Sequence, residues 1–491
     1  MLTHIALLSF GMAEFKMLAF VLYVILVLAF IFVIIKDSQD PVKALAWITV
    51  IALLPILGFV LFMLFGRNHR KAKIFNIKES ADMEILLETL SAQQIFELNN
   101  RIFQRKEISQ NRDIITLLLN SNKSLLTARN KVTVLNDGAD TFDAIKRELR
   151  KAKTFIHLEY YIFDMDKLGR EIAAILMEKA RQGVEVRVIY DDVGSWGLST
   201  RFLRRMRDAG VDARCFMPVA FPWLTSKINY RNHRKIIVID GEVGFTGGIN
   251  IAQRYIDGTK DGIWRDTHLM IEGEAVSSLN VIFITDWNFV SGQKLRDPDK
   301  YFPPSSVDIE SPVQIASSGP DTDWASIMQA FFAAIAKAKE YIYISTPYFL
   351  PNQAVLTAIK VASLSGIKVK LLIPNKPDSM VVHWATRSYV KELLDAKVEV
   401  YLYKKGFNHS KLIMIDGVFS SVGTANMDIR SFEDNFEVSA ILYDSNITKQ
   451  LEDTFLEDIG DSVQVIKEEW EKRPYYCIVL ESFARLLSPL L

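Results

Sequence analysis

The stretch Asn229–Asn250, NYRNHRKIIVIDGEVGFTGGIN, sets the pattern on which the chain is built. Its centre, HRKIIVID, places three chemically active side chains in one frame: His233, Lys235 and Asp240. The frame recurs far downstream in HSKLIMID, with the same residue types: His409, Lys411 and Asp416. The chain has seven histidines, and chance then predicts on the order of 0.03 such frames. Two copies therefore indicate a duplicated functional unit.

Each frame contains a short apolar run, IIVI or LIMI, that predicts a buried strand. Residues two apart on a strand share a face, so the histidine and lysine of each frame point the same way. This pair suits a phosphate, because the lysine binds non-bridging oxygens while the histidine attacks phosphorus or protonates the leaving oxygen. Asp240 and Asp416 fall at the strand ends, where we expect each to anchor the backbone or pair with a cation.

Small residues and an asparagine follow each frame. The first copy continues GFTGGIN, with Gly248 and Asn250, and the second continues SVGTAN, with Thr424 and Asn426. Small residues let backbone N–H groups approach an anion, and an asparagine amide adds another donor. We therefore expect these four residues to bind or orient a phosphate. Gly248 lacks the hydroxyl of Thr424, so the copies are not chemically identical.

One carboxylate lies beyond each of these segments: Asp266 in WRDTH and Glu437 in RSFEDNFE. A carboxylate in this place would hydrogen-bond the far nitrogen of a catalytic histidine and fix its tautomer. The alternative is that each is an ordinary surface or ion-pair carboxylate.

Further segments repeat outside the frames. KAKTFIHLEYYIF (Lys151–Phe163) is similar to KAKEYIYISTPYFL (Lys337–Leu350), and RQGVEVRVIYDD (Arg181–Asp192) to LSGIKVKLLIPN (Leu364–Asn375). Helical stretches such as REIAAILMEKARQG alternate with these strands. This order predicts an α/β sheet covered by helices, twice over.

Exchange at a phosphodiester through a covalent intermediate explains why two copies are needed. It requires a nucleophile on one side of phosphorus and an acid on the other. Packing about a pseudo-two-fold axis would place His233 and His409 on opposite sides of one phosphate, where they titrate as a coupled pair. The two lysines supply positive charge, so we expect neither a metal ion nor another cofactor.

Two apolar runs predict a membrane hairpin near the N-terminus. Phe15–Ile35 is long enough to span a bilayer, and Ala44–Phe65 forms a second run that Pro55 would kink. Basic residues follow the second run, whereas the loop between the runs has balanced charge, so the positive-inside rule places the catalytic body in the cytoplasm. A cleaved signal peptide is disfavoured, because the first run is long and a second follows at once.

Composition limits the other function classes. Lys and Arg together number 58, as do Asp and Glu, so the formal net charge is zero and nothing suggests a nucleic-acid partner. Cys215 and Cys477 have neither metal-ligand nor disulfide spacing, so we expect reduced thiols. The segment between the hairpin and the first copy has helical spacing, which predicts a connector near the membrane surface or a solvated linker helix.

The doubled frame resembles the phospholipase D superfamily, and the segments NYRNHRKIIVIDG, WRDTHL and GTANMDIRSFEDNFE are similar to those of bacterial cardiolipin synthases. The resemblance covers nearly the whole chain. It implies two tandem phospholipase D-like α/β/α sandwich domains, related by a pseudo-two-fold axis and preceded by a two-helix transmembrane hairpin. We expect the hairpin at 1–66, a helical juxtamembrane connector at 67–132, and the two domains at 133–300 and 301–491.

The resemblance also implies a multi-pass transferase of the cell membrane that joins two phosphatidylglycerols into cardiolipin and releases glycerol. By this analogy His233 attacks and His409 protonates the departing glycerol, although swapped roles suit the same residues. The expected partners are the lipid bilayer, phosphatidylglycerol and cardiolipin, with no nucleic acid. The resemblance is also compatible with a homo-oligomer. The alternatives are a phospholipase D that hydrolyses phosphatidyl groups and a catalytically silent membrane scaffold.

Overall fold

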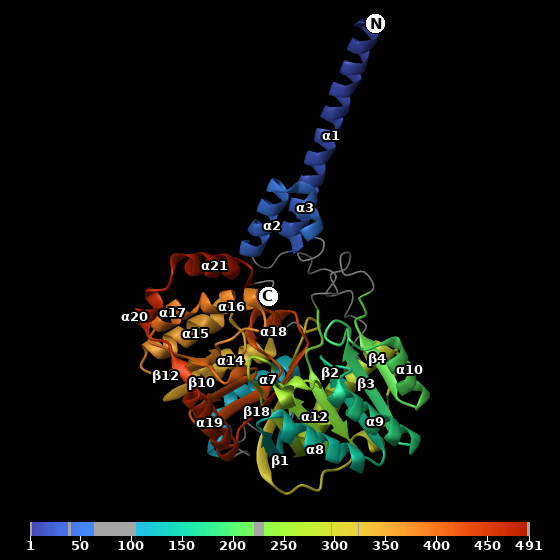
Figure 1. The fold of residues 1–491 in the computed structure, drawn as a ribbon, viewed down its shortest axis with the longest axis vertical. Coiled ribbons are helices and arrows are strands. Elements are labelled where there is room, and N and C mark those ends of the chain that lie inside the picture. The colour runs from blue at the N-terminus through green and yellow to red at the C-terminus, as the bar shows by residue number, and fades with distance from the viewer. Residues whose placement is uncertain are drawn as a thin grey trace. The chain divides into compact units, whose positions relative to one another are not determined.

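The computed structural model describes most of the chain: residues 2–37, 41–62, 105–219, 230–295, 297–322 and 324–488. The chain divides into two compact units. One comprises Met1–Ile77 with Val219–Asn229, and the other comprises Lys78–Pro218 with Tyr230–Leu491. The first unit contains the N-terminal helices, and the second, here called the body, contains both copies of the sequence repeat (Figure 1).

The first unit is helical, with α1 (Leu2–Asp37), α2 (Pro41–Leu53) and α3 (Pro55–Leu61). Leu54 leaves the helical conformation (φ −131°, ψ 72°), because the residue before a proline is disfavoured there. The predicted kink at Pro55 is therefore confirmed. Ile34, Ile51 and Phe62 form a small buried cluster within this unit. Among the described residues, no helix combines the length and the apolar character that a membrane crossing requires.

The first copy alternates strands and helices, as the repeat predicted. Its strands are β1 (Leu126–Leu135), β2 (Phe155–Tyr160), β3 (Glu185–Asp191), β4 (Asp212–Phe216), β5 (Lys235–Ile239), β6 (Val243–Gly247), β7 (Ile263–Arg265) and β8 (His268–Gly273). Its helices are α8 (Gly138–Lys151), α9 (Lys167–Arg181), α10 (Thr200–Asp208), α11 (Arg254–Asp257), α12 (Ala275–Ser291) and α13 (Pro298–Tyr301). Aspartate caps start helices α8 and α9, each accepting a backbone N–H from the third residue after it.

The second copy repeats this order. Its strands are β9 (Glu310–Ser318), β10 (Tyr341–Ser345), β11 (Phe349–Leu350), β12 (Lys368–Pro374), β13 (Glu399–Tyr403), β14 (Gly406–Asn408), β15 (Leu412–Ile415), β16 (Phe419–Gly423), β17 (Met427–Asp428), β18 (Glu437–Leu442) and β19 (Ser462–Gln464). Its helices are α14 (Ser326–Lys337), α15 (Gln353–Leu364), α16 (Met380–Arg387), α17 (Val390–Asp395), α18 (Ile429–Glu433), α19 (Ser445–Gly460), α20 (Lys467–Glu471) and α21 (Tyr475–Leu486).

One fifteen-stranded sheet runs through the body in the order β19-β13-β12-β10-β15-β16-β18-β9-β1-β8-β6-β5-β2-β3-β4. Apart from β19, the order is symmetric about the antiparallel pair β9–β1, in which Leu126 lies opposite Gln314. Two copies related by a two-fold axis produce this arrangement. The frame strands β5 and β15 are buried at every residue and stand at matching places in the sheet, as predicted.

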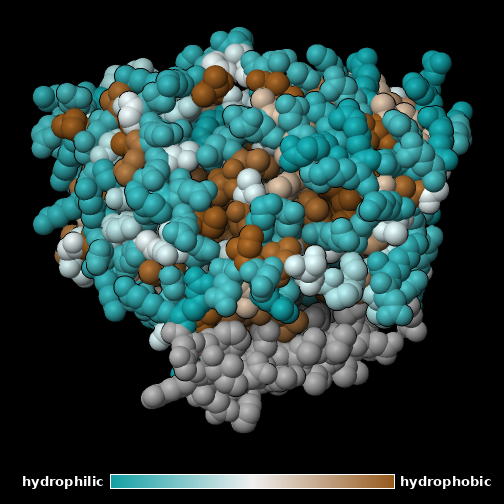
Figure 2. Space-filling model, turned by 90° about the horizontal axis from the view of Figure 1, so that it is seen from below, coloured by the Kyte–Doolittle hydropathy of each residue, from teal (hydrophilic) through white to brown (hydrophobic). Residues whose placement is uncertain are grey.

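Helices cover both faces of the sheet in each copy (Figure 1). In β2, Ile156 and Leu158 face the apolar core shared with α8 and α9. The alternate residue His157 faces α12, where its ring stacks on Phe283 with centroids 4.3 Å apart. The strands are therefore buried on both sides, which is why they read as continuous apolar runs. Hydrophilic side chains cover most of the face seen in Figure 2, and apolar ones show there in separate patches.

The predicted connector differs from expectation where the structure describes it. Residues 67–104 lie outside the described residues. The part that follows forms α6 (Lys106–Gln110), α7 (Arg112–Asn122) and the start of β1. Ile115 and Leu118 of α7 are fully buried in the core of the second copy, against α14. This segment is part of the body's core, because its apolar face packs there instead of facing a membrane surface or water.

Candidate active site

The two sequence frames meet at one cavity of about 580 Å³. His233 and His409 both line it, each reaching it from just before a frame strand. The geometry therefore brings both imidazoles to a single space, as a shared phosphate site requires.

A short β-contact between the copies positions His233. Its backbone N–H donates to Phe436 O (2.9 Å), and Asn232 forms a parallel bridge with Phe436. Because Glu437 follows Phe436, this bridge brings the carboxylate of Glu437 to 3.0 Å from His233 Nδ1. The carbonyl of Thr424 lies 3.1 Å from the same nitrogen. With Nδ1–H held in this way, Nε2 is the nitrogen left for chemistry.

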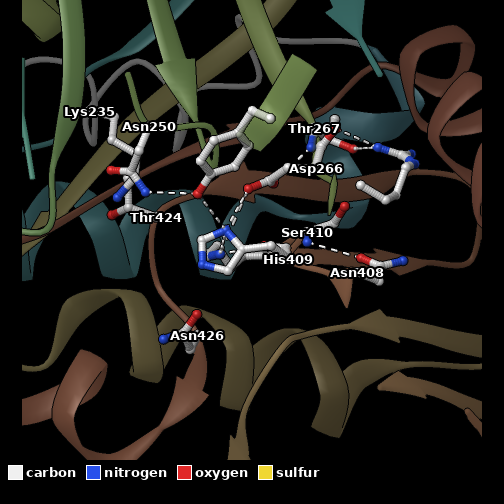
Figure 3. A network of polar contacts seen from close by, with 12 residues as sticks. Lys235, Asn250, Asp266, Thr267, Asn408, His409, Ser410, Thr424 and Asn426 are labelled. Atoms are coloured by element: carbon white, nitrogen blue, oxygen red, sulfur yellow. Dashed lines mark hydrogen bonds and ion pairs between the residues drawn. The ribbon is translucent and has the colours of Figure 1, made fainter. Parts of the chain in front are cut away.

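The pseudo-symmetric contact positions His409. Strands β14 and β7 pair in parallel, and the backbone N–H of His409 donates to Arg265 O (2.7 Å). Asp266 follows Arg265, and its Oδ2 lies 2.7 Å from His409 Nδ1 (Figure 3). The hydroxyl of Tyr255 lies 3.2 Å from this nitrogen. Each histidine is thus oriented by a carboxylate from the other copy, a crossing that the sequence did not specify.

The lysines of the frames are buried beside their histidines. Lys235 Nζ donates to His233 O (2.7 Å), and Lys411 Nζ donates to His409 O. Among the described residues, the side chains that line the cavity include neither lysine. Burial lowers the pKa of Lys235 to about 7 and that of Lys411 to about 8. An anion placed next to them would favour their charged forms.

The two carboxylates differ in charge state. Burial raises the pKa of Asp266, in spite of the nearby lysine of the second frame. Burial also acts to raise the pKa of Glu437, but His233, Lys235 and the hydroxyl of Thr424 together outweigh burial, and the pKa lies below its usual range. Burial lowers the pKa of both histidines, that of His409 well below its usual range. Both imidazoles are therefore neutral near pH 7.

Gly248 and Thr424 lie behind the histidines and not in the cavity. The hydroxyl of Thr424 donates to Glu437. A Cβ at Gly248 would lie only 2.1 Å from Asp266 Oδ1, so a side chain there would displace that carboxylate. Their backbone N–H groups donate to neighbouring carbonyls (2.9 and 3.0 Å). These N–H groups already donate hydrogen bonds within the protein, so they are not available to a phosphate. The two residues orient carboxylates instead, which differs from the phosphate binding that we expected.

Asn250 and Asn426 both line the cavity, as expected of residues at a phosphate. Asn250 Nδ2 donates to Tyr255 Oη (2.9 Å), while its Oδ1 accepts from the N–H of Ile162 (3.2 Å). Asn426 stands across the cavity from this network, on the far side of His409 (Figure 3). The asparagines therefore present amides from both copies.

Asp240 and Asp416 lie in the turns after the frame strands, away from the cavity. Asp240 and Gly241 both adopt positive φ (54° and 72°) in the turn between β5 and β6, where the N–H of Glu242 donates to Ile239 O (3.0 Å). The carboxylate of Asp240 accepts backbone N–H groups of residues 153, 154 and 155 (2.8–2.9 Å). Asp416 does the same for residues 339, 340 and 341 (2.7–2.9 Å). Of the two expected roles, each aspartate has that of a backbone anchor and is not catalytic.

Sequence spacing missed several residues of the cavity, including three arginines: Arg231, Arg254 and Arg430. Arg254 and Arg430 each lie four residues after an asparagine of the site, in NIAQR and NMDIR, and this repeat is the signal that could have found them. Tyr161 also lines the cavity, with its ring edge-on to His233 at 4.9 Å between centroids. The cavity thus contains three arginines that the frames did not predict, together with the carboxylates of Asp378 and Asp428.

Known families match this chain over most of its length. The model described as "Cardiolipin synthase, PLD-like domain" matches 145–287 and 331–459, more than half of the chain, and "Phospholipase_D-nuclease N-terminal" matches 24–67. The cardiolipin synthase of Geobacillus kaustophilus is 44% identical over 94% of this chain and 91% of its own. The major cardiolipin synthase of Bacillus subtilis is 41% identical to this chain, and the match covers 96% of this chain and 98% of that protein.

A solved structure shares the fold. The phosphatidylserine synthase of Haemophilus influenzae superposes with a TM-score of 0.60 at 15% identity, covering 79% of this chain and 100% of that chain. At that identity the likeness concerns the fold alone. It agrees with two tandem phospholipase D-like α/β copies.

The anchoring role of Asp240 predicts a stability effect. Asp240→Ala leaves three backbone N–H groups without their acceptor, so we expect the free energy of unfolding to fall by roughly 3 kcal/mol. Circular dichroism of the full chain during denaturation in detergent measures it. The control Asp261→Ala removes an exposed ion pair with Lys376 and should cost less than about 1 kcal/mol. An Asp240→Ala protein of unchanged stability but no activity would contradict the anchoring role.

Proposed function

The chain belongs to the cardiolipin synthase family of phospholipase D-like proteins, and from this premise we propose that it is a phosphatidyltransferase. It transfers the phosphatidyl group of one phosphatidylglycerol to a second, so that cardiolipin forms and glycerol leaves. The observation that carries the proposal is the single cavity lined by both frame histidines, His233 and His409. Each is held at Nδ1 by a buried carboxylate of the other copy.

In the first half of the reaction, we assign the attack to His233, in the order that the family resemblance implies. Its Nε2 forms a bond to phosphorus while the bond from phosphorus to the glycerol oxygen breaks. His409, having gained a proton as the anionic substrate bound, gives it to that oxygen, and glycerol leaves. The product is a phosphatidyl-histidine.

In the second half, the hydroxyl of another phosphatidylglycerol attacks the phosphatidyl-histidine. His409 takes the proton of this hydroxyl, a new phosphorus–oxygen bond forms, and the bond from phosphorus to His233 breaks. Glu437 keeps the ring of His233 in the tautomer with Nδ1–H, and both Glu437 and Asp266, each within hydrogen-bond distance of an Nδ1, stabilise the imidazolium forms. The frame lysines, buried beside the histidines, would offset the negative charge of the phosphate, and the two asparagines that line the cavity would bind its non-bridging oxygens.

We also propose that residues 1–66 form a transmembrane hairpin in the cell membrane, so that the chain is multi-pass and its catalytic domains, assigned to 133–300 and 301–491, face the cytoplasm. Along α1, large apolar side chains are exposed: Met17, Leu18, Phe20, Phe32 and Ile35. Their transfer from water to lipid is favourable. The family match over 24–67 and the basic residues after the second run agree with this arrangement.

The proposed chemistry predicts the products. The purified full chain, incubated with phosphatidylglycerol vesicles, should yield cardiolipin and glycerol in equal amounts, measured by chromatography and mass spectrometry. Phosphatidic acid alone would identify a hydrolase, and no turnover a silent scaffold. His233→Ala should form no covalent intermediate. His409→Ala lacks both the acid of the first half and the base of the second, so it should form phosphatidyl-histidine at position 233 slowly and fail to turn it over. A labelled peptide at 409 in His233→Ala would reverse the assigned roles.

The buried lysines predict a pH dependence. Lys235 and Lys411 attract the anionic phosphate electrostatically when protonated, and their pKa values of about 7 and about 8 lie far below the usual value near 10.5. As pH rises through 7 and 8 the free enzyme loses both cations, so kcat/KM should fall there and KM should rise. Initial rates on vesicles across this range measure it. A kcat/KM that stays level up to the usual lysine pKa would contradict the prediction.

The hairpin predicts a labelling pattern. In a chain without its native cysteines, Asp37→Cys places a thiol at the end of α1, next to the loop between the runs, and should react with an impermeant maleimide on intact cells. Lys376→Cys, exposed on the body, should react only after the membrane is opened. Labelling of Lys376→Cys in intact cells would place the body outside and overturn the orientation.

A further inference from the structure

Two arginines at matching positions line the cavity, and the mechanism above uses neither: Arg254 and Arg430. The proposed transfer brings together two lipids, each with a phosphate, and only one phosphate lies between the histidines. We propose that Arg254 forms a second anion subsite, which binds the phosphate of the acceptor lipid. The inference rests on the proposed function and names how its second substrate is recognised.

Arg254 stands on the side of the cavity where His409 lies. Its guanidinium carbon is 5.3 Å from the ring centre of Trp264 and 5.9 Å from that of Tyr255. Both rings also neighbour His409: the Trp264 and imidazole centroids are 6.0 Å apart, and the Tyr255 hydroxyl is 3.2 Å from Nδ1. His409 deprotonates the incoming hydroxyl in the proposed order. The acceptor's glycerol therefore lies on this side, and its own phosphate is one glycerol further along.

Arg254 has donors that its protein contacts leave available. Its Nη1 pairs with Asp164 at 3.2 Å, and both side chains are about one-third exposed (32% and 33%). Its buried Nε has no hydrogen-bond partner within the described part of the chain. A guanidinium presents a planar fork of donors that matches phosphate oxygens, and the two aromatic rings hold it in place.

The cavity has room for two headgroups. Its volume of about 580 Å³ falls within the range of roughly 300–1,000 Å³ that ligand sites occupy. In the proposed reaction the central phosphate lies between the imidazoles, and Arg254 lines the same cavity together with Trp264 and Tyr255. A phosphate at Arg254 would therefore lie beside the reacting one and not replace it.

The test compares an acceptor that carries a phosphate with one that does not. Given labelled glycerol, the full chain in phosphatidylglycerol vesicles can form two products from one intermediate: cardiolipin, and labelled phosphatidylglycerol by glycerol exchange. Arg254→Gln should lower cardiolipin formation about ten-fold or more, as the loss of charge-assisted hydrogen bonds does. Glycerol exchange should fall much less. Arg254→Lys keeps the charge and should recover part of the difference.

Controls decide between a subsite and a structural role. Arg181→Gln, exposed on α9, should change neither reaction. Equal loss of both reactions in Arg254→Gln would mean a role in the fold or at the central phosphate and would overturn the inference, as would no loss. If Arg430→Gln, and not Arg254→Gln, lost cardiolipin formation selectively, the acceptor lipid would bind at Arg430 and the inference about Arg254 would be overturned. An unmodified chain that exchanges glycerol but forms no cardiolipin would refute the proposed function itself.

Discussion

The site depends on two backbone hydrogen bonds exchanged between the copies. In each copy the backbone N–H of the frame histidine donates to a backbone carbonyl of the other copy. His233 donates to Phe436 and His409 donates to Arg265, and the residue after each of these acceptors carries the carboxylate that orients the histidine. Side chains on an extended segment alternate in direction, so a slip of one residue would turn the carboxylate away from its imidazole. Neither copy by itself contains an oriented histidine. The duplication therefore supplies more than a second set of groups, because each copy completes the other.

Exclusion of water is the second constraint, and it acts on cations and imidazoles alike. Burial lowers the pKa of Lys235 and Lys411 into the range of neutral pH, and it keeps both histidines uncharged. A buried ammonium group is stable only beside a negative charge, so the site favours an anionic ligand. A histidine must be neutral to attack phosphorus. Affinity for a phosphate and readiness of the nucleophile thus arise from the same burial.

The copies are related but not equivalent. Behind one histidine, Glu437 receives a hydrogen bond from the hydroxyl of Thr424 and has a lowered pKa. Behind the other, the shorter Asp266 packs against Gly248, where no side chain fits, and has a raised pKa. A reaction that needs one nucleophile and one acid needs the two imidazoles in different protonation states, and a coupled pair can reach these by sharing one proton. The unlike carboxylates therefore act on the choice of which histidine holds that proton.

By itself the sequence determined the duplication, the buried frame strands and the residue types that suit a phosphate, because these follow from local spacing and periodicity. It also restricted Asp240 to two roles. Tertiary structure alone decided which carboxylate serves which histidine, that Gly248 makes room for Asp266, and that the arginine of NIAQR faces the cavity. These features depend on contacts between residues far apart in the chain. The β-contacts between the two copies bring such segments together, and local sequence spacing carries no information about them.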